Sequence, residues 1–269
     1  MENQLPPAVT KIVKESGDVK IHTFVAPESF ISNATHVIET KNQCIVIDGQ
    51  FVVPYALQFR EYVDAIGKPI SRVYLSHGHP DHFFGIGAAF ADCEIYALQE
   101  TIDFIKVAGE SIRDELAKGY GDFVTKTIAV PQNVITAGEE TIDGLKLEHV
   151  LHKDTETEFH LSIKLPELDT YIVQDLVYSG AHIYLTKDIP HWVEILESIR
   201  DSEFSLFLPG HGEPADKKEL QSNIEYLNFA NSLLNAGTTA EALKAALLEK
   251  YPHLTGAGIF DIYLPRLFA

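Results

Sequence analysis

The order of predicted secondary-structure elements in the first half of the chain is repeated in the second half. The first copy has two strands, a helix and a third strand, predicted at residues 35–40, 43–48, 54–66 and 70–75. The second copy has the same four elements, predicted at residues 160–165, 170–175, 189–200 and 204–208. The second strand of each copy ends at an aspartate, and a histidine follows the last strand of each copy. Two such copies predict two similar layers of sheet and helix that meet at a shared edge.

The loop after the strand at 70–75 is rich in metal-ligating side chains. Within residues 76–85 it carries four of them, His77, His79, Asp81 and His82. The preceding strand is apolar and ends on a Gly/Pro segment, so these side chains are expected at the carboxyl edge of a sheet, where functional groups collect in α/β proteins. The first two histidines point the same way in extended chain, whereas Pro80 bends the chain and turns the other two ligands toward a neighbouring position. The spacing therefore predicts two adjacent metal ions better than one; a polar surface turn is the alternative.

Two more ligand candidates follow strands of the second copy. Asp175 ends a strand so apolar that an unpaired carboxylate would be costly to bury there, and a metal ion would offset that cost. A buried, ion-paired aspartate is the alternative. His211 lies in a Pro-Gly-His-Gly segment directly after the last strand. Strand position thus selects these two side chains from the later part of the chain.

The pattern His-x-His-x-Asp-His at residues 77–82 resembles the signature of the metallo-β-lactamase-fold superfamily, and the resemblance extends along nearly the whole chain. It implies an α/β (α+β) fold, a four-layer αβ/βα sandwich of two repeated halves with the metals between them. We expect one domain over residues 1–269. The resemblance also implies that Asp175 bridges two ions, that His211 is the final metal histidine, and that Asp48 supports the histidine loop without binding metal.

The third motif of the superfamily departs from its usual form in this chain. The superfamily has a histidine there, usually followed by threonine. Counting back from the turn at residues 165–167 places Glu156 at this position, with a threonine after it. Alkylsulfatase-type members also carry a glutamate there, so we expect Glu156 to be the ligand. His152 is the rival, because a locally longer loop could bring it to the site, whereas His149 and His160 are expected to be structural.

The resemblance implies a metallo-hydrolase with two divalent ions, and zinc is the expected metal. A hydroxide held between the ions would attack a small ester, lactone, thioester or similar substrate, while Asp81 orients the water or relays its proton. A glutamate at position 156 makes the ligand shell with its hydroxide formally neutral, so iron or manganese becomes more competitive. Two other functions stay open: an iron-dependent redox enzyme of the dioxygenase or oxygen-reductase type, and a non-catalytic metal-binding protein.

The charge of the chain restricts its partners. The formal net charge is −18, from 21 basic and 39 acidic residues, which argues against nucleic acid and anionic membrane. No apolar stretch approaches the roughly 20 residues that span a bilayer, and the start of the chain does not resemble a secretory signal. We therefore expect a cytoplasmic protein whose partner is a small-molecule substrate.

Substrate selection is expected in segments outside the two copies. Residues 99–130 are expected to contain an amphipathic helix and to form a helical lid insertion, whose Tyr120 and Phe123 are substrate-binding candidates; a helix that only packs is the alternative. His182 and Tyr184, shortly after Asp175, are two more candidates. Residues 214–269 are expected to add C-terminal helices that cover the sheet or form a homo-oligomer contact.

Overall fold

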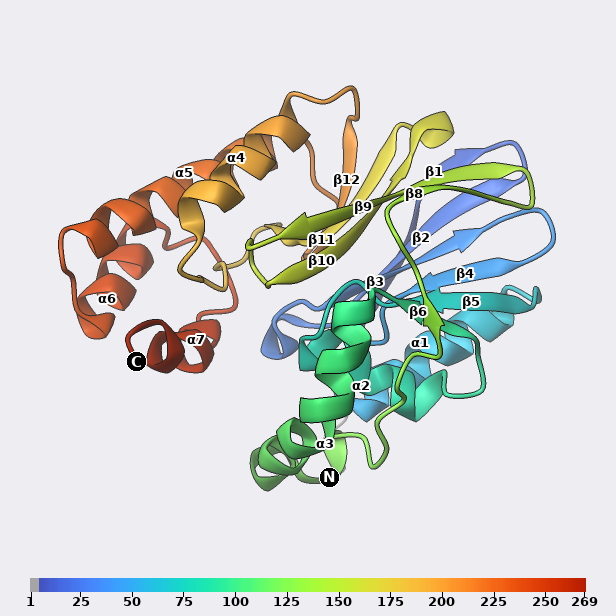
Figure 1. The fold of residues 1–269 in the computed structure, drawn as a ribbon, viewed down its shortest axis with the longest axis horizontal. Helices are drawn as coiled ribbons and strands as arrows, with labels where there is room; N and C mark the ends of the chain where they lie inside the picture. The colour runs from blue at the N-terminus through green and yellow to red at the C-terminus, as the bar shows by residue number, and fades with distance from the viewer. Residues whose placement is uncertain (1–4) are drawn as a thin grey trace.

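Two β-sheets form the centre of the protein, which is described over residues 5–269 by a computed structural model. The first sheet has seven strands in the order β1 to β7, which are Val9–Ser16, Val19–Val25, Ala34–Glu39, Cys44–Ile47, Ile70–Tyr74, Ile95–Ala97 and Asn133–Val134. The second sheet has the order β12-β11-β10-β9-β8, and β8 to β12 are Gly138–Ile142, Leu145–Lys153, Phe159–Leu165, Thr170–Tyr178 and Leu206–His211. Figure 1 shows the two sheets lying one above the other.

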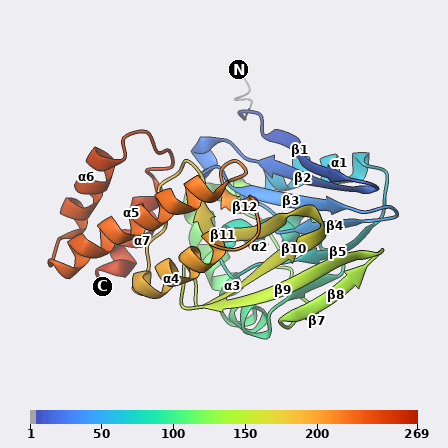
Figure 2. The ribbon, with the colours of Figure 1, turned by 90° about the horizontal axis from the view of Figure 1, so that it is seen from above.

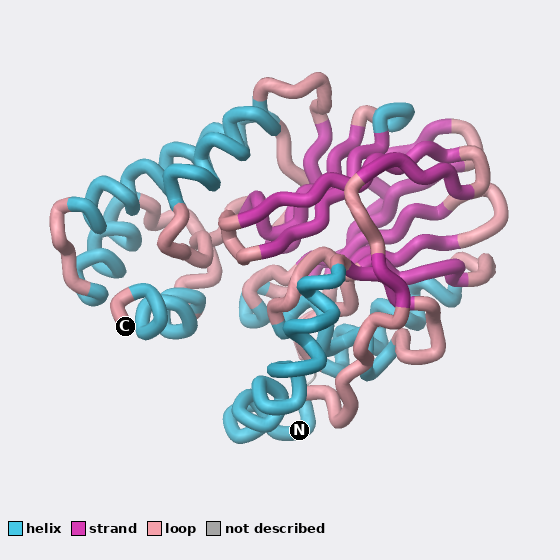
Figure 3. The backbone as a smooth tube through the Cα atoms, viewed as in Figure 1, coloured by secondary structure: helices cyan, strands magenta, loops and turns pink. Residues whose placement is uncertain are grey.

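Helices cover the outer faces of both sheets (Figure 1). The helices α1 to α3 on the side of the first sheet are Val53–Ala65, Pro80–Ala89 and Gln99–Tyr120. On the side of the second sheet, α4 and α5 are Ile189–Arg200 and Lys217–Asn235, and they are followed by α6 and α7 at Ala240–Lys250 and Ile259–Leu267. Figure 2 shows α6 and α7 at one end of the molecule. The strands form two central layers between helices in Figure 3, which is the predicted αβ/βα sandwich.

The predicted repeat is present in the strand pairing. In the first sheet, β3 pairs antiparallel with β4, and β4 pairs parallel with β5 after the crossover helix α1. In the second sheet, β10 pairs antiparallel with β11, and β11 pairs parallel with β12 after the crossover helix α4. Parallel neighbours need such a crossover, and it places the ends of β5 and β12 at corresponding edges of their sheets.

Strand β4 is apolar at every position, and both of its faces are covered. Cys44 and Val46 pack in the cluster beneath the first sheet, together with Phe59 of α1. Ile45 and Ile47 point the other way, into the cluster between the two sheets. Because successive side chains of a strand face opposite sides, a strand with both faces covered must be apolar at every position.

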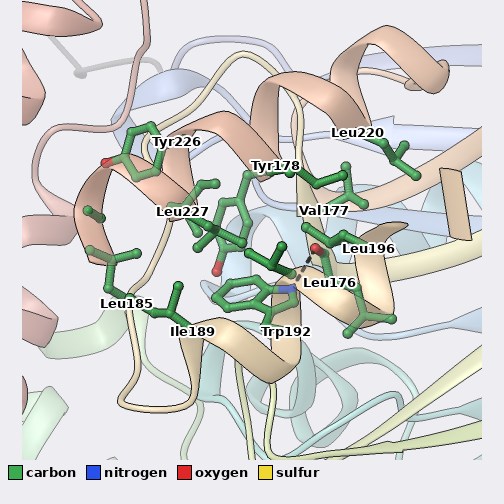
Figure 4. Packing of buried hydrophobic residues seen from close by; sticks show 14 of the residues in the cluster. Leu176, Val177, Tyr178, Leu185, Ile189, Trp192, Leu196, Leu220, Tyr226 and Leu227 are labelled. Atoms are coloured by element: carbon green, nitrogen blue, oxygen red, sulfur yellow. Dashed lines mark hydrogen bonds between the residues drawn. The ribbon is translucent and has the colours of Figure 1, made fainter. Parts of the chain in front are cut away.

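The outer layer of the second sheet is organised around Trp192 of α4 (Figure 4). Its side chain is fully buried, and its indole nitrogen donates a hydrogen bond to the carbonyl of Leu176 at 3.0 Å. Leu196 of the same helix and Leu227 of α5 belong to the same cluster. The buried ring thereby fixes α4 against β11, the strand that carries Asp175.

The segment at residues 99–130 is the crossover between two parallel strands of the first sheet, β6 and β7. Its helix α3 buries Thr101, Ile102 and Ile105 and leaves Phe104 and Val107 exposed. Among residues 5–269, no helix combines the length and the apolarity that a membrane span requires.

Candidate metal centre

Pro80 divides the histidine loop into two parts. The loop follows β5, and α2 begins at Pro80, which occupies the first turn of the helix, where its missing N–H is not needed. His79 is extended, with φ −79° and ψ 144°, as the residue before a proline prefers. His77 and His79 therefore stand on the loop, while Asp81 and His82 stand on the first turn of α2.

The structure brings seven side chains together in two overlapping groups. The ligand atoms within each group all lie within 4.8 Å of one another. One group consists of His77, His79, Glu156 and Asp175, and the other of Asp81, His82, Asp175 and His211. Asp175 belongs to both groups. Each half of the chain contributes ligands to each group, as the repeat predicted.

In the first group, the carboxylate of Glu156 lies between the two loop histidines. Its Oε1 is 3.0 Å from Nδ1 of His79, and its Oε2 is 3.7 Å from Nε2 of His77. Nε2 of His77 is also 3.6 Å from Oδ2 of Asp175. The 3.0 Å distance suits a hydrogen bond between His79 and Glu156, whereas the two longer separations suit atoms that share one ion.

In the second group, two imidazoles face two carboxylates. Nε2 of His211 is 3.2 Å from Oδ2 of Asp175 and 3.2 Å from Oδ2 of Asp81. Nε2 of His82 is 3.1 Å from Oδ1 of Asp175 and 3.6 Å from Oδ2 of Asp81. The two oxygens of Asp175 thus face different histidines.

Several atoms at the centre of the site lack hydrogen-bond partners. Four of the buried side-chain atoms without a partner are Nε2 of His77, Nε2 of His82, Oε2 of Glu156 and Oδ1 of Asp175. Leaving such atoms unsatisfied costs about 1–3 kcal/mol each, and more for charged groups. All four point into the two groups, and imidazole and carboxylate are ligands that divalent transition metals accept. The residues therefore fit metal ions.

Hydrogen bonds on the outer side orient the histidines inward. Nδ1 of His82 donates to Oδ2 of Asp48 at 2.8 Å. Nδ1 of His77 donates to Oγ of Ser76 at 2.9 Å, and this hydroxyl donates to Asp48 at 2.6 Å. Nδ1 of His211 donates to the carbonyl of Ile31 at 2.8 Å. In each ring these bonds hold Nδ1 on the outer side and turn Nε2 toward the centre, so Asp48 occupies the supporting position expected for it.

Burial and the nearby carboxylates shift the pKa values of the site in opposite directions for some of its histidines. Burial lowers the pKa of His77 well below the usual value and raises the pKa of Glu156. Burial would also lower the pKa of His82, but the surrounding carboxylates, Asp175 first, raise it well above the usual value. For His211 the same carboxylates overcome burial and raise the pKa to about 10. The carboxylates thus stabilise positive charge beside His82 and His211, and either protons or metal ions can supply that charge.

Gly210 makes room for the shared aspartate. A Cβ atom at this position of β12 would lie 1.8 Å from Oδ1 of Asp175 and 3.0 Å from Cε1 of His82. The backbone next to His211 can therefore approach the ligands only because residue 210 has no side chain.

His152, the rival of Glu156, lies outside both groups. It stands on β9, where its Nε2 hydrogen-bonds with Oγ of Ser162 at 2.8 Å. The loop after β9 instead carries Glu156 into the site. His149 pairs with Glu140 at 3.2 Å, and the ring of His160 stacks on that of His77 with centroids 5.1 Å apart. All three histidines therefore have structural contacts.

A cavity of about 280 Å³ opens above the ligands. Of the four predicted substrate-binding residues, Tyr120 and Tyr184 line it. His182 does not, because its irregular segment is held by Thr255 and turns the ring to the hydroxyl of Tyr226, at 3.1 Å. Phe123 also lies outside the lining, and its ring packs near that of Phe30 with centroids 6.4 Å apart.

Several cavity residues were not predicted from the sequence. Tyr178 is fully buried, and its hydroxyl lies 3.2 Å from Oδ2 of Asp175 and 3.4 Å from Oε1 of Glu156. Its ring stacks on that of His211 with centroids 4.7 Å apart. Apolar walls come from four separate segments, with Phe30, Ile31, Phe51, Ile112, Leu116, Ile259 and Ile262. The apolar character of residues 256–269 was the signal that this segment is buried, but its contact with the site depends on tertiary packing.

The chain is similar in sequence to known proteins. A sequence model described as the metallo-beta-lactamase superfamily matches residues 30–211. A linear primary-alkylsulfatase from Pseudomonas sp. (strain ATCC 19151) is 22% identical over 268 residues, covering 82% of this chain and 50% of that protein. The chain therefore spans about half the length of this curated relative.

Two solved structures show the same fold. The metallo-beta-lactamase FIM-1 from Pseudomonas aeruginosa, in its mono-zinc form, has a TM-score of 0.63 at 16% identity and covers 86% of this chain and 99% of its own. A metallo-beta-lactamase from Pontibacter korlensis has a TM-score of 0.62 at 16% identity and covers 82% of this chain and 99% of its own. The residues that the family model matches contain all seven side chains of the two groups, and His211 is the last of the matched residues. The chain belongs to the metallo-beta-lactamase superfamily.

Proposed function

We propose that the protein is a metal-dependent hydrolase that holds two divalent ions and acts on a small ester, lactone, thioester or similar compound. The observation that carries this proposal is the pair of ligand groups that share Asp175 at the floor of the cavity. A cavity of about 280 Å³ suits a small-molecule partner better than a polymer. Divalent ions in such a site acidify a coordinated water and polarise the bond that is cleaved.

We propose zinc as the metal, with iron or manganese as alternatives. Three carboxylates, Asp81, Glu156 and Asp175, supply oxygen ligands beside the imidazoles. Carboxylate oxygen suits iron and manganese more than a histidine at position 156 would. The mono-zinc form of the solved relative supports zinc as the first metal to test.

We assign Asp81 the role of handling the proton of the attacking water. Its side chain is 14% exposed and lines the cavity, whereas the side chains of Glu156 and Asp175 are 0% and 1% exposed. All three carboxylates line the cavity, and Asp81 is the most exposed of them to solvent. Its Oδ2 contacts His211, so it can hold its place in the group while it orients a water or accepts a proton.

Tyr178 supplies a hydroxyl at the junction of the two groups. The nearby carboxylates and burial keep it protonated, since burial first and Asp175 next raise its pKa well above the usual value. A neutral phenol at the cavity floor can donate a hydrogen bond to an oxygen of the substrate that gains negative charge during the reaction.

The test combines metal analysis with a substrate panel. Protein reconstituted separately with zinc, iron and manganese is expected to hold two ions per chain and to hydrolyse at least one ester, lactone or thioester. Alkyl sulfates belong in the panel, because the curated relative is named an alkylsulfatase and apolar residues line the cavity. At most one ion per chain in every reconstitution would count against the dinuclear centre. Dioxygen consumption without hydrolysis would favour the redox enzyme, and neither activity would favour a metal-binding protein.

A further inference from the structure

The C-terminal helix α7 supplies one wall of the cavity. Ile259, Ile262 and Arg266 of this helix all line it, facing the histidine loop and α3. The family match ends at residue 211, so this wall lies outside the part of the chain that the family model covers.

Arg266 is a cation without a carboxylate partner at the mouth of the cavity. Its Nη1 donates to the hydroxyl of Tyr184 at 3.1 Å, and no carboxylate within residues 5–269 lies within ion-pair distance of it. The chain has 39 acidic and 21 basic residues, so an arginine at its surface meets an excess of carboxylates. Glu115, which also lines the cavity, pairs with Lys118 instead. The guanidinium of Arg266, which lines the same cavity, thus has no carboxylate partner among residues 5–269.

Tyr184 separates this cation from the ligand groups. Its ring lies 5.2 Å from the ring of His79, between centroids, while its hydroxyl at the far end contacts Arg266. About the length of one tyrosine side chain therefore stands between the metal ligands and the guanidinium. An anion bound by Arg266 must be a different group from the bond that is cleaved at the metal centre. The cavity that both positions line has apolar walls, which include Ile112, Leu116, Ile259 and Ile262.

We propose that Arg266 selects substrates in which an apolar body joins the scissile group to a second, anionic group such as a carboxylate. This inference rests on the proposed hydrolysis and specifies its substrate class. A guanidinium binds a carboxylate through two parallel hydrogen bonds, which gives direction as well as attraction. The apolar walls hold the chain between the two ends, so that the anion at Arg266 and the scissile bond at the ligand groups are engaged together.

The test uses two esters of octanedioic acid on the zinc-loaded protein. The monomethyl ester carries a free carboxylate, and the dimethyl ester is its neutral counterpart. We expect kcat/KM to favour the monoester, after correction for the two equivalent bonds of the diester. Arg266→Gln should lower this preference by about 10- to 100-fold, the range for hydrogen bonds to charged groups. The change should lie mainly in KM, because the anion is bound equally before and during the reaction.

Two variants separate recognition from general charge effects. Arg266→Lys keeps the charge but loses the fork, so part of the preference should remain. Arg200→Gln removes the same charge from the end of α4, outside the cavity lining, and should leave the preference unchanged. An equal preference in the parent and in Arg266→Gln, or a parent that favours the neutral diester, would overturn the proposal.

Binding distinguishes this proposal from the hydrolysis on which it rests. If the parent hydrolyses neither ester, the hydrolase function fails for these compounds, but calorimetry of the monoester on the zinc-loaded protein still reports on Arg266. Weaker binding by Arg266→Gln than by the parent and by Arg200→Gln supports the proposal. Equal binding by all three proteins, or no binding by the parent, overturns it.

Discussion

Glu156 sets the charge of the first ligand group. It is fully buried, one of its oxygens faces Nδ1 of His79 at 3.0 Å, and the other has no hydrogen-bond partner. A histidine at this position would be neutral, so the glutamate lowers the charge of the group by one. With metal bound, a less positive group would attract an anionic substrate less strongly and acidify its water less. Binding of an anionic substrate would then depend more on other side chains, such as Arg266.

Removing the charge of Glu156 should weaken metal binding. Glu156→Gln keeps the shape of the side chain but replaces a charged ligand oxygen, so we expect the metal affinity to fall by about 10-fold or more. His152→Gln is the matched control, since His152 bonds to Ser162 outside both groups. Chelator competition and elemental analysis measure both variants. A larger loss in the His152 variant than in the Glu156 variant would contradict the assignment.

The role of Asp81 can be separated from metal binding. Asp81→Asn keeps an oxygen ligand and loses the group that accepts a proton, so hydrolysis should fall by about 10²-fold or more. Metal content has to be measured on the same sample, because loss of the contact between Asp81 and His211 would also weaken metal binding. Parental rates with two ions bound would show that Asp81 does not relay the proton.

The seven side chains of the two groups could be predicted from the sequence as candidate ligands, because each follows the end of a strand or is counted from a turn. Tyr178 could not be predicted in this way. It stands three residues after Asp175, and such residues face opposite sides of a regular strand. Gln174 has φ 46°, and the pairing of β11 with β12 shifts register on both sides of it. This irregularity, which the residue types do not reveal, brings the hydroxyl of Tyr178 beside the carboxylate of Asp175.

The passage of β12 behind the ligands depends on Gly210. Gly210→Ala should displace the strand or Asp175, because the added Cβ would lie 1.8 Å from Oδ1 of the aspartate. We expect metal content to fall severely. Gly119→Ala is the control: it lies in α3 with no heavy atom within 4 Å of the added Cβ, and alanine is the better helix former by about 1 kcal/mol. Full metal content in the Gly210 variant would show that the strand relaxes around the methyl group.

The repeated elements and the cavity wall differ in how far sequence predicts them. The strands of each copy were predictable because their apolar runs report burial on both faces, as in β4. The contribution of α7 was not, since an apolar helix packs equally well over a sheet, against another chain or beside a site. His182 and Tyr184 illustrate the same limit, because they are two residues apart in an irregular segment and only Tyr184 reaches the cavity.

The whole molecule is expected to lose stability in acid. Burial lowers the pKa of His152 to about 3 and that of His182 to about 4, from a usual value of 6.5. The unfolded chain therefore binds more protons than the folded one below pH 6.5, and the free energy of unfolding decreases as pH falls from there toward about 3. Each proton that only the unfolded chain binds adds up to about 1.4 kcal/mol per pH unit to the slope of the free energy of unfolding against pH.

Urea unfolding of metal-free protein across this pH range measures the effect. His152→Gln removes one titrating group and should make the loss of stability with acid shallower, although the variant is less stable at neutral pH. Tyr171 and Ser162 contact His152, while His160, Lys164 and His191 are the charged neighbours that also lower its pKa. An unchanged slope would show that His152 does not titrate between the folded and unfolded states.

Because Asp175 belongs to both ligand groups, the two groups do not fill independently. With two cations bound, the charge of this one carboxylate would be divided between them, and the first cation would repel the second at short range. Metal uptake should therefore be anti-cooperative, with a second ion held more weakly than the first. At limiting metal the population would consist mainly of half-loaded molecules, and a titration would show two separate steps instead of one.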